Sequence, residues 1–477
     1  MVLLNCPPST MAIPPVGIGA ISEYLRLHGF DAPVIDLNIE LFKAAGDGDR
    51  RAWDLDKKNV WLDGGSLDAL LSRLAAPLER CVERALGYDG YLIGMTLMHS
   101  REQVATELIR RVRERDPGRR IVLGGPLFSS PGMRHAFSVH CDYDWAVVGE
   151  GELAARALLE LVGRGEEPWS GAVQGMYLRE EILGPEPEKV PHPPIVPLDQ
   201  LPFPRYGDLD PVDYQHRDPF PAVWSRGCPG RCAFCESWRI WGSHRQRSPW
   251  DIQEELRFIR ERFWNDHVAV FDAVINADIV ALERLGRLVV DRGPRITWEG
   301  NFIASRRMSP GLYRLLRRAG CRRAYFGMES GSPRVVRLMK KPFSLETLRD
   351  NITWAHGAGI EVFVNIITGF PGEGEREFEE TLSFLRRHRE VITGVEFVTE
   401  CQIPEETDLM LHPERFGIVI PEKDAGFMWR TEDGANTMEV RKERSRIVHD
   451  ECVRLGLIAM PSTTLTDGLV PSLDETS

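Results

Sequence analysis

The stretch Trp224-Ser225-Arg226-Gly227-Cys228-Pro229-Gly230-Arg231-Cys232-Ala233-Phe234-Cys235-Glu236 decides how the rest of the chain is interpreted. It holds three cysteines, Cys228, Cys232 and Cys235, in the spacing C-x3-C-x2-C. Three thiolates this close along the chain can face one point and bind a soft metal ion or an iron–sulfur cluster. A structural zinc site would want a fourth Cys or His, and His244 is the only near candidate. A four-iron cluster with three cysteine ligands leaves one iron open for a small cofactor, and we predict a site of this kind.

The remaining cysteines show no paired spacing and are typical of reduced core or loop thiols. They are Cys6, Cys81, Cys141, Cys321, Cys401 and Cys452. The N-terminus has no basic region followed by a cleavage site, so we expect no signal peptide. No apolar run approaches the roughly 20 residues of a membrane span. The sequence therefore predicts a cytoplasmic protein.

The length of 477 residues is enough for two or three domains, each with a core of its own. A hydrophobic content of 43% and a charged content of 27% are ordinary for a globular protein. The formal net charge of -12 argues against a general nucleic-acid-binding protein, and we expect no nucleic-acid partner.

The cysteine spacing, together with a predicted strand before it and Phe234 just before the last cysteine, resembles the radical S-adenosylmethionine (SAM) superfamily. The resemblance implies that Cys228, Cys232 and Cys235 bind a [4Fe-4S] cluster whose open iron holds SAM. It also implies that electron transfer from the cluster splits SAM to a 5′-deoxyadenosyl radical. An electron donor such as flavodoxin or ferredoxin follows from this chemistry, and Phe234 becomes a candidate cofactor contact.

The first 165 residues alternate short apolar strands with amphipathic helices. Strands are expected at residues 2–4, 34–36, 91–95, 121–123 and 145–148. This alternation predicts a doubly wound parallel sheet, in which ligands bind beyond the carboxyl ends of the strands. Gly17-Ile18-Gly19 with Asp36 downstream imitates a dinucleotide-binding fingerprint, but no third glycine follows and the first strand ends too early.

The loops at these strand ends resemble the cobalamin-binding domain that precedes many radical SAM domains. The resemblance covers about residues 1–165 and implies cobalamin contacts at Pro15, Gly17, Thr96, Gly124, Gly125, Gly149 and Glu150. The D-x-H-x-x-G motif that supplies an axial histidine in such domains is absent. His99 lies near a strand end and is at least as well explained as a loop histidine. We therefore predict that cobalamin binds without a histidine ligand.

Residues 166–215 are rich in proline and are expected to form a linker. From residue 216 to 400 the alternation resumes, with strands expected at 222–225, 268–272, 295–299, 324–327, 362–367 and 395–399. Such a pattern predicts an incomplete (β/α)6 barrel, as the radical SAM resemblance also implies, with chemistry at the strand ends. Residues 401–477 are expected to form a small C-terminal cap over the barrel mouth.

Two segments of the barrel resemble further family motifs. Gly327-Met328-Glu329-Ser330-Gly331 resembles the G-x-E-S-G segment, which makes Glu329 and Ser330 candidate SAM ligands. Gly369 and Pro371 resemble the loop that cradles the adenosyl group, and Asp272 ends the second strand. The structural alternatives are a glutamate favoured by a helix N-terminus and a turn that needs glycine and proline. No catalytic residue is assigned from the sequence.

The combined resemblance implies a cobalamin-dependent radical SAM enzyme that methylates an unactivated carbon of a small-molecule or natural-product substrate. The first alternative is the same cofactor set performing a cyclisation or rearrangement without methyl transfer. A methylthiotransferase is disfavoured because it would need a second cysteine set. A non-catalytic cobalamin or cluster sensor would need an effector surface, and no such element is visible in the sequence. The substrate itself is not readable from the sequence.

Overall fold

The computed structural model describes residues 1–54, 60–90, 92–98, 100–169, 171–185, 196–210, 213–214, 219–421, 426 and 428–459. The chain divides into two compact units, the first within Met1–Arg217 and the second within Asp218–Thr466. No helix in the described ranges is long and apolar enough to cross a membrane.

The sheet of the first unit has the strand order β2-β1-β3-β4-β5-β6 among the described residues. Every neighbouring pair is parallel except β5 with β6. The strands are β1 (Val2–Asn5), β2 (Val34–Asp36), β3 (Leu92–Thr96), β4 (Arg120–Gly124), β5 (Trp145–Val147) and β6 (Met176–Leu178). The order 2-1-3-4-5 is that of a doubly wound fold, and it places a topological switch point between β1 and β3. The predicted fold class of this unit is confirmed.

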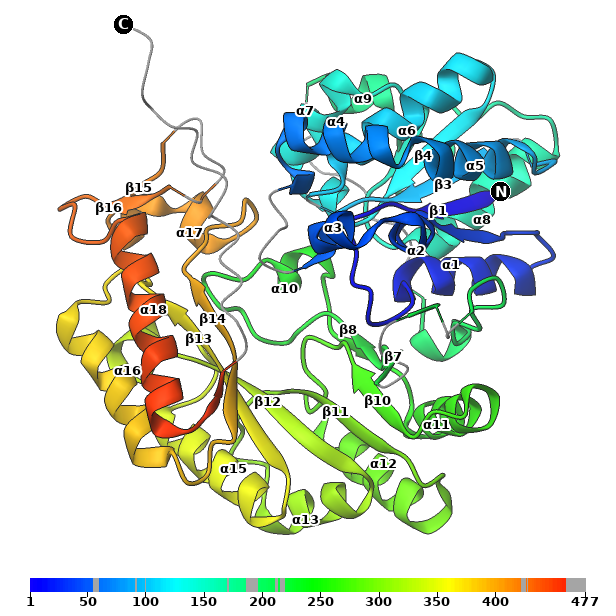
Figure 1. Ribbon diagram of the computed structural model, residues 1–477. Coiled ribbons are helices and arrows are strands. Elements are labelled where there is room, and N and C mark those ends of the chain that lie inside the picture. Colours follow the sequence, from blue (N-terminus) through cyan, green and yellow to red (C-terminus); the bar gives the residue numbers. More distant parts are fainter. Residues whose placement is uncertain are drawn as a thin grey trace, which may run out of the picture. The chain divides into compact units, whose positions relative to one another are not determined.

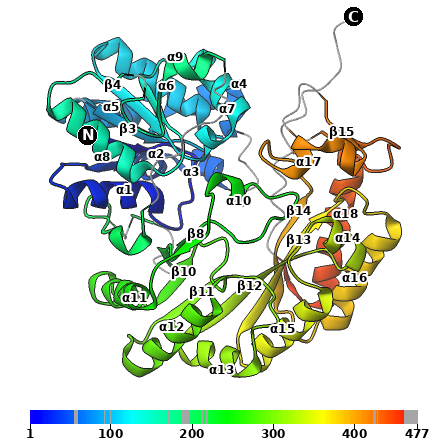
Figure 2. The ribbon, with the colours of Figure 1, turned by 180° about the vertical axis from the view of Figure 1, so that it is seen from behind.

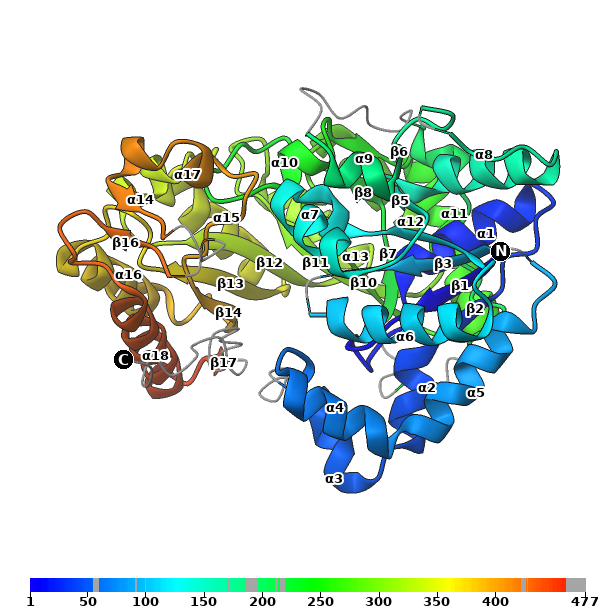
Figure 3. The same ribbon diagram turned by 90° about the horizontal axis from the view of Figure 1, so that it is seen from above.

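Helices cover both faces of this sheet, as Figure 3 shows for α1 and α8 on one side and α5 and α6 on the other. Alternate residues of β1 separate the two cores, because Val2 and Leu4 pack with one cluster and Leu3 with the other. The helices are α1 (Val16–Leu27), α2 (Leu37–Ala44), α3 (Asp47–Arg50), α4 (Gly64–Arg73), α5 (Ala75–Leu86), α6 (Glu102–Arg115), α7 (Pro131–His140), α8 (Gly151–Gly163) and α9 (Arg179–Leu183).

The main sheet of the second unit is parallel throughout, with the order β17-β14-β13-β12-β11-β10-β7 in the described part of the chain. Its strands are β7 (Phe220–Ala222), β10 (His267–Val270), β11 (Thr297–Phe302), β12 (Cys321–Glu329), β13 (Glu361–Thr368), β14 (Gly394–Glu400) and β17 (Ile458–Ala459). Strands that follow one another in sequence are neighbours in space, as expected for repeated strand–helix units. The expected first strand at 222–225 differs, because β7 ends at Ala222. Ser225–Arg226 (β8) instead pairs antiparallel with Arg245–Gln246 (β9).

The longer helices of the second unit lie along one face of this sheet (Figures 1 and 2). They are α11 (Pro249–Phe263), α12 (Ile279–Arg292), α13 (Pro310–Arg318), α15 (Leu345–Gly357), α16 (Glu375–His388) and α18 (Met438–Leu455). The unit also contains the short helices α10 (Ser237–Ile240), α14 (Pro333–Leu338) and α17 (Asp408–Leu411). Ser248 and Ser309 cap α11 and α13, since each hydroxyl accepts a backbone N–H of the first turn and a proline follows. Residues beyond 401 also contribute the edge strand β17 and a two-stranded ladder of β15 (Ile418–Val419) with β16 (Arg430–Thr431).

Candidate functional site

The cysteine loop lies between β8 and α10 and is held at its base and in its middle. The β8–β9 ladder closes the base. In the middle, the Ala233 N–H donates to the Met339 carbonyl at 3.0 Å, and the Leu409 N–H donates to the Ala233 carbonyl at 3.3 Å. Ala233 is fully buried in a hydrophobic cluster with Phe370 and other residues. The loop is therefore fixed by neighbours from distant parts of the sequence.

The three thiols are partly buried, and the positive charge of Lys341 acts on two of them, Cys228 and Cys232. The Gly230 N–H donates to Cys228 Sγ at 3.4 Å. A Cβ on Gly230 would stand 3.4 Å from Cys228 Sγ and 3.9 Å from Cys232 Sγ, so the loop passes close to both sulfurs. Burial raises the pKa of Cys232 to about 11, and the positive Lys341 acts in the opposite direction. Burial likewise raises the pKa of Cys228, against the Gly230 N–H and Lys341.

The donor set fits a cluster held by three thiolates. No three His, Cys, Asp or Glu side chains in the described ranges converge closely enough for a single metal ion. A four-iron cluster does not need that convergence, because each thiolate binds a different iron. A positive side chain and a backbone N–H near the sulfurs both favour the ionised thiolates that such a cluster requires.

Glu329 ends β12 in a conformation that few non-glycine residues adopt. Its φ is +63°, and the register with β13 shifts between Gly327 and Glu329. The side chain is buried, and Oε1 lies 3.0 Å from Lys341 Nζ. A Cβ on Gly327 would stand 2.4 Å from Glu329 Oε1, so only glycine leaves room for this carboxylate. Strained backbone held by its surroundings is common at functional sites.

Lys341 was not predicted from the sequence. It follows α14, and its Nζ lies 5.7 Å from the ring centroid of Phe234 as well as beside Glu329. The ring of Phe234 in turn packs edge-on against Phe370, with centroids 6.4 Å apart. Phe234 thus links the cysteine loop to the buried lysine and the hydrophobic cluster. Its contact with a cofactor stays a prediction.

The residues after Glu329 form a tight turn against α16. The Gly331 N–H donates to Thr381 Oγ1 at 3.0 Å, and Ser330 Oγ lies 3.3 Å from the same oxygen. The Ser332 N–H donates to Ser330 Oγ at 3.1 Å. A Cβ on Gly331 would stand 2.6 Å from Thr381 Cα, which explains the glycine of the motif. The structure thus gives the Ser330 hydroxyl partners inside the protein.

Asp272 lies just past β10 and supports the segment that leads into the cysteine loop. Its Oδ1 accepts the Trp224 N–H at 2.8 Å, while Oδ2 is buried with no hydrogen-bond partner. Burial raises the pKa of this carboxyl to about 7, against hydrogen bonds at the Trp224–Ser225 backbone and the positive Arg247. Asn301 donates to the Asp272 carbonyl at 2.9 Å and is structural.

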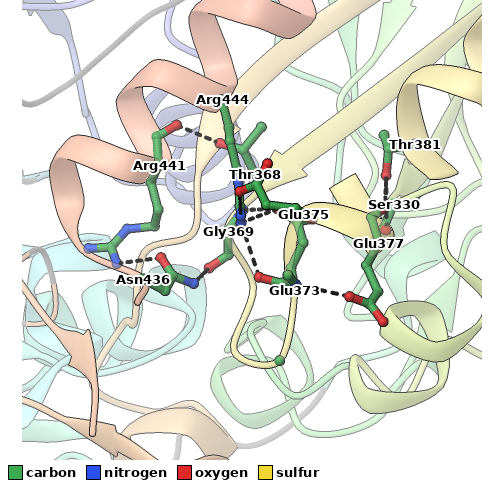
Figure 4. A network of polar contacts seen from close by, with 12 residues as sticks. Ser330, Thr368, Gly369, Glu373, Glu375, Glu377, Thr381, Asn436, Arg441 and Arg444 are labelled. Carbon is green, nitrogen blue, oxygen red and sulfur yellow. Dashed lines mark hydrogen bonds and ion pairs between the residues drawn. The ribbon is translucent and has the colours of Figure 1, made fainter. Parts of the chain in front are cut away.

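Gly369 and its loop pack against α18 and against Asn436, which lies just before this helix (Figure 4). The Gly369 N–H donates to Glu373 Oε1 at 2.7 Å, and the Gly369 carbonyl accepts from Asn436 Nδ2 at 2.8 Å. The φ of Gly369 is +70°, and a Cβ there would stand 2.3 Å from Arg441 Cγ. The loop therefore needs glycine for a turn and for close packing. The predicted cofactor contacts of Gly369 and Pro371 stay predictions.

A layer of charged and polar side chains crosses the main sheet below these strand ends, and the sequence analysis missed it. Glu299 Oε2 lies 3.1 Å from His267 Nε2 and 3.2 Å from Arg323 Nη1, and the Tyr325 hydroxyl donates to Glu299 Oε1 at 3.1 Å. These residues come from the adjacent strands β10, β11 and β12. The alternation of side chains along each strand could have indicated that these residues share one face of the sheet. Which of them contact one another depends on the register between the strands.

In the first unit, the predicted residues follow the carboxyl ends of β1, β3, β4 and β5. Gly124 pairs with Thr96 across β3 and β4. Gly125 has a φ of +100°, and a Cβ there would stand 2.5 Å from the Leu97 carbonyl oxygen and 2.8 Å from Thr96 Oγ1. The β3 and β4 loops are therefore packed against each other and brought together as predicted from the topology.

The other predicted residues of this edge lie at helix starts. Pro15 caps α1, Gly17 lies in its first turn, and Glu150 caps α8 after Gly149, whose φ is +102°. A Cβ on Gly17 would meet no atom within 4 Å, so space is open beside this turn. Open space at the start of α1 fits a ligand that approaches the backbone closely.

The switch point between β1 and β3 holds a buried polar network that the sequence did not predict. Asp36 accepts from Asn5 Nδ2 at 2.9 Å and from the Tyr214 hydroxyl at 2.8 Å, and it also caps α2. Arg101 donates to Asn5 Oδ1 at 3.0 Å and to the Pro8 carbonyl at 3.1 Å. Asp36 is thus committed to internal hydrogen bonds, which argues against a ribose-binding role. His99 lies outside the described residues.

Residues 223–385 match the model of the Radical SAM superfamily. An uncharacterized methyltransferase of Pyrococcus horikoshii is 27% identical over 336 residues, which cover 68% of this chain and 69% of that protein. The anaerobic magnesium-protoporphyrin IX monomethyl ester cyclase of Synechocystis is 25% identical over 336 residues. That alignment covers 68% of this chain and 65% of the cyclase, so the chain spans slightly less than two thirds of the cyclase's length.

Two solved structures match both units. The radical SAM methyltransferase TsrM from Kitasatospora setae, with cobalamin and a [4Fe-4S] cluster bound, superposes with a TM-score of 0.67 at 16% identity. The match covers 93% of this chain and 84% of TsrM. The cobalamin-dependent radical SAM enzyme OxsB, with aqua-cobalamin bound, gives a TM-score of 0.63 at 16% identity and covers 98% of this chain and 62% of OxsB.

The family match over residues 223–385, which include the cysteine loop, shows that this chain contains a radical SAM domain. Its fold across the chain is the fold of the cobalamin-dependent enzymes TsrM and OxsB. An enzyme is therefore favoured over a non-catalytic sensor.

Proposed function

We propose that this chain is a cobalamin-dependent radical SAM enzyme that methylates an unactivated carbon of a small-molecule or natural-product substrate. The observation that carries the proposal is the cysteine loop with Lys341 and Glu329 beside it, in a chain of which 93% superposes on the methyltransferase TsrM. The relative from Pyrococcus horikoshii is also named a methyltransferase.

In this proposal the second unit holds the cluster and SAM. Cys228, Cys232 and Cys235 are the cluster ligands, and Phe234, Glu329, Ser330, Asp272, Gly369 and Pro371 surround or support the SAM site. With the cluster and SAM bound, the site supplies radical chemistry. The protein's own contribution is to hold the loop rigidly through Ala233, to place the positive Lys341 near it and to fix Glu329 in its strained conformation.

The first unit is proposed to bind cobalamin, which supplies methyl-transfer chemistry when bound. Pro15, Gly17, Thr96, Gly124, Gly125, Gly149 and Glu150 line the carboxyl edge of its sheet, where ligands bind in this fold class. We assign residues 1–165 to this role, 166–215 to a linker, 216–400 to the radical SAM domain and 401–477 to a C-terminal cap. A separate electron donor such as flavodoxin or ferredoxin and a cytoplasmic location complete the proposal.

The test begins with anaerobic reconstitution, which should give about four iron and four sulfide per chain. Incubation with SAM, a reductant and candidate metabolites should then yield 5′-deoxyadenosine and a methylated product detected by mass spectrometry. Replacement of Cys228, Cys232 or Cys235 by Ala should abolish both the cluster and SAM cleavage, whereas Cys452→Ala, at a buried thiol of α18, should preserve them. A wild-type preparation that takes up only zinc would contradict the proposal.

A second candidate is cyclisation or rearrangement without methyl transfer. The observation that favours it is the similarity to the magnesium-protoporphyrin ester cyclase over 68% of this chain. Product analysis separates the two reactions, because only methyl transfer adds the mass of a methylene unit to the substrate.

A further inference from the structure

The short helix α17 lies in the segment proposed as the C-terminal cap, yet its first turn contacts the cysteine loop. Thr407 begins this helix, because its hydroxyl oxygen accepts a backbone N–H of the first turn at 3.3 Å. The Leu409 N–H points out of the same turn and donates to the Ala233 carbonyl at 3.3 Å. Ala233 lies between the second and third cysteines. The start of α17 is therefore fixed to the middle of the predicted cluster loop.

The Asp408 carboxylate in this turn joins two cations on either side of the cysteine loop. Its Oδ1 lies 3.1 Å from Arg239 Nη2, and its Oδ2 lies 2.6 Å from Lys340 Nζ. Arg239 belongs to α10, which begins two residues after the last cysteine. Lys340 directly follows Met339, whose carbonyl accepts the Ala233 N–H at 3.0 Å. One carboxylate thus connects the segment after the loop with the segment that supports its middle.

Aromatic stacking extends this connection back into the loop itself. Arg239 Cζ lies 4.2 Å from the ring centroid of Trp238, and Arg231 Cζ lies 5.5 Å from the same ring. Arg231 directly precedes the second cysteine. A guanidinium group over an indole ring is attracted by the ring electrons, so Trp238 holds both arginines near it. Asp408 is therefore linked to the loop through Arg239, Trp238 and Arg231 as well as through Ala233.

The effect of Asp408 is expected to be local. Its side chain is 15% exposed, and both of its oxygens are engaged by different segments. Burial raises the pKa of Asp408, but the hydrogen bonds from Lys340 and Arg239 outweigh burial and lower it, so the group is ionised. The Lys340 side chain is 54% exposed, and ion pairs with exposed partners contribute little to overall stability. Loss of the carboxylate should therefore loosen the cysteine loop without unfolding the protein.

We propose that Asp408 is a positioning residue for the cluster: by bridging Arg239 and Lys340, it holds the cysteine loop in the conformation that retains the cluster. This inference rests on the proposed function, because it presupposes a cluster at Cys228, Cys232 and Cys235. It assigns α17, within the proposed C-terminal cap, to the cluster site.

The experiment measures iron release from the reconstituted full-length protein to the ferrous chelator bathophenanthroline disulfonate, under anaerobic conditions with dithionite. Asp408→Asn keeps the shape of the side chain and removes its charge. It should speed iron release by about tenfold, the lower end of the loss expected for an outer contact of a metal site. The EPR signal of the reduced cluster should broaden, because the loop adopts more than one conformation. Asp408→Glu keeps the charge and should release iron at a rate near that of the wild type.

Variants of the two cations test whether the bridge itself matters. Arg239→Met and Lys340→Met each break one side of it and should each show part of the effect. Once both cations are replaced, Asp408→Asn should cause little further change, since the contacts form one unit. Glu414→Gln is the matched control, because this carboxylate lies six residues further on, is 68% exposed and lies 3.7 Å from its neighbour Arg415. It should release iron at the wild-type rate.

The outcomes separate this inference from the proposed function. A wild-type protein that binds no iron contradicts the proposed function itself. A wild-type four-iron cluster that loses iron no faster in Asp408→Asn overturns only the role of Asp408. Faster release with an equal fall of the urea midpoint in Asp408→Asn and Asp408→Glu would indicate packing alone and would also overturn it. If Asp408→Asn does not fold, Arg239→Met and Lys340→Met decide, because wild-type release rates in both contradict the inference.

Discussion

The conformation of Glu329 depends on the residue two positions before it. Glu329 occupies the left-handed region with a φ of +63°, which costs of order 1–3 kcal/mol for a non-glycine residue. The missing side chain of Gly327 leaves the space that the Glu329 carboxylate fills beside Lys341. The G-x-E spacing is thus explained by sterics as well as by resemblance.

Gly327→Ala is expected to displace the Glu329 carboxylate. The new Cβ would stand 2.4 Å from Glu329 Oε1 and 3.1 Å from Lys341 Nζ, so the ion pair must shift. We expect formation of 5′-deoxyadenosine from SAM to fall by about tenfold or more, since small displacements of binding groups have effects of this size. The assay is quantification of 5′-deoxyadenosine by liquid chromatography. Gly357→Ala in α15 is the control, because a Cβ there meets no atom within 4 Å. Equal activity of both variants would show that Glu329 has no part in SAM cleavage.

The sequence could indicate candidate residues within one motif, because the spacing of the motif is visible in it. It could not indicate contacts between residues of separate motifs. Cys228, Cys232 and Cys235 lie on one anchored loop. The negative charge of Glu329 acts on Cys232. Lys340 and Lys341 are adjacent lysines that the sequence does not distinguish. Only the structure shows that one pairs with Asp408 on the surface while the other is buried beside Glu329.

The contact between α18 and the Gly369 loop rests on a buried ion pair. Arg444 Nη1 lies 3.1 Å from Glu373 Oε1, with both side chains at most 6% exposed, and Glu373 also accepts the Gly369 N–H. Burial raises the pKa of Glu373 to about 7, against the Gly369 hydrogen bond and Arg444. The loop is thus positioned by a helix some 70 residues further along the chain.

Arg444→Met should destabilise the protein by about 3–5 kcal/mol, because it leaves the buried Glu373 carboxylate without its cation. Chemical denaturation followed by circular dichroism measures the loss. Arg446→Met on the same helix is the control, since Arg446 is 62% exposed and its ion pairs should contribute less than about 1 kcal/mol. The double variant Arg444→Met with Glu373→Gln should recover part of the loss. Equal destabilisation by Arg444→Met and Arg446→Met would contradict this account.

Helix α11 carries a buried carboxyl that predicts a pH dependence of stability. Burial raises the pKa of Glu255 to about 8, against the positive Arg247. The folded state therefore binds this proton more tightly than the unfolded state. The contribution is fully present below the unfolded pKa of about 4.3 and is lost as the pH rises toward 8.

Glu255→Gln should remove this loss, because an amide stays neutral across the range. Relative to the wild type, the variant should gain stability from pH 5 to pH 8 at about 1.4 kcal/mol per pH unit, a few kcal/mol in total. Urea denaturation at several pH values gives the difference. Glu254→Gln, at a neighbouring side chain that is 35% exposed and paired with Arg257, should show no such slope. A difference for Glu255→Gln that is constant with pH would rule out a proton bound in the folded state.

At the level of elements, strands with strong apolar runs were predictable and short edge strands were not. The expected strands at 324–327 and 362–367 lie within β12 and β13. By contrast, β17 has only two residues. Its place beside β14 depends on tertiary packing and not on a hydrophobic pattern in its own sequence. The register shift in β12 also has no sequence signal of its own, because it depends on how Glu329 pairs with β13.

At the scale of the whole molecule, the fold class was predictable because two runs of strand–helix alternation have only a few allowed topologies. The order 2-1-3-4-5 in the first unit and sequential neighbours in the second follow from short, right-handed connections. The sequence did not reveal the network of Asp36, Asn5 and Arg101, because its members come from three separate loops and strand ends. Such networks depend on tertiary contacts that no local pattern encodes.

The histidines of the first unit decide whether the protein can supply an axial ligand to cobalamin. The motif that would supply a histidine is absent from the sequence. Of the three described histidines of this unit, His135 is exposed in the middle of α7, and the other two lie at the amino edge of the sheet. His28 follows the last turn of α1 and His140 ends α7, and helices that alternate with parallel strands end at the amino edge. We therefore expect cobalamin to bind without a histidine ligand.

His99→Ala tests this expectation, because His99 follows β3 and is the histidine that the sequence places nearest the carboxyl edge. The visible spectrum of bound cobalamin should be essentially unchanged in the variant, since loss of an axial imidazole would alter it. Gly125→Ala is the contrasting variant: its Cβ would stand 2.5 Å from the Leu97 carbonyl oxygen, so it should weaken cobalamin binding without any change of axial ligand. A clear spectral shift in His99→Ala would identify His99 as the ligand. Failure of the wild type to bind cobalamin would instead remove the basis for methyl transfer and favour the cyclisation or rearrangement reaction.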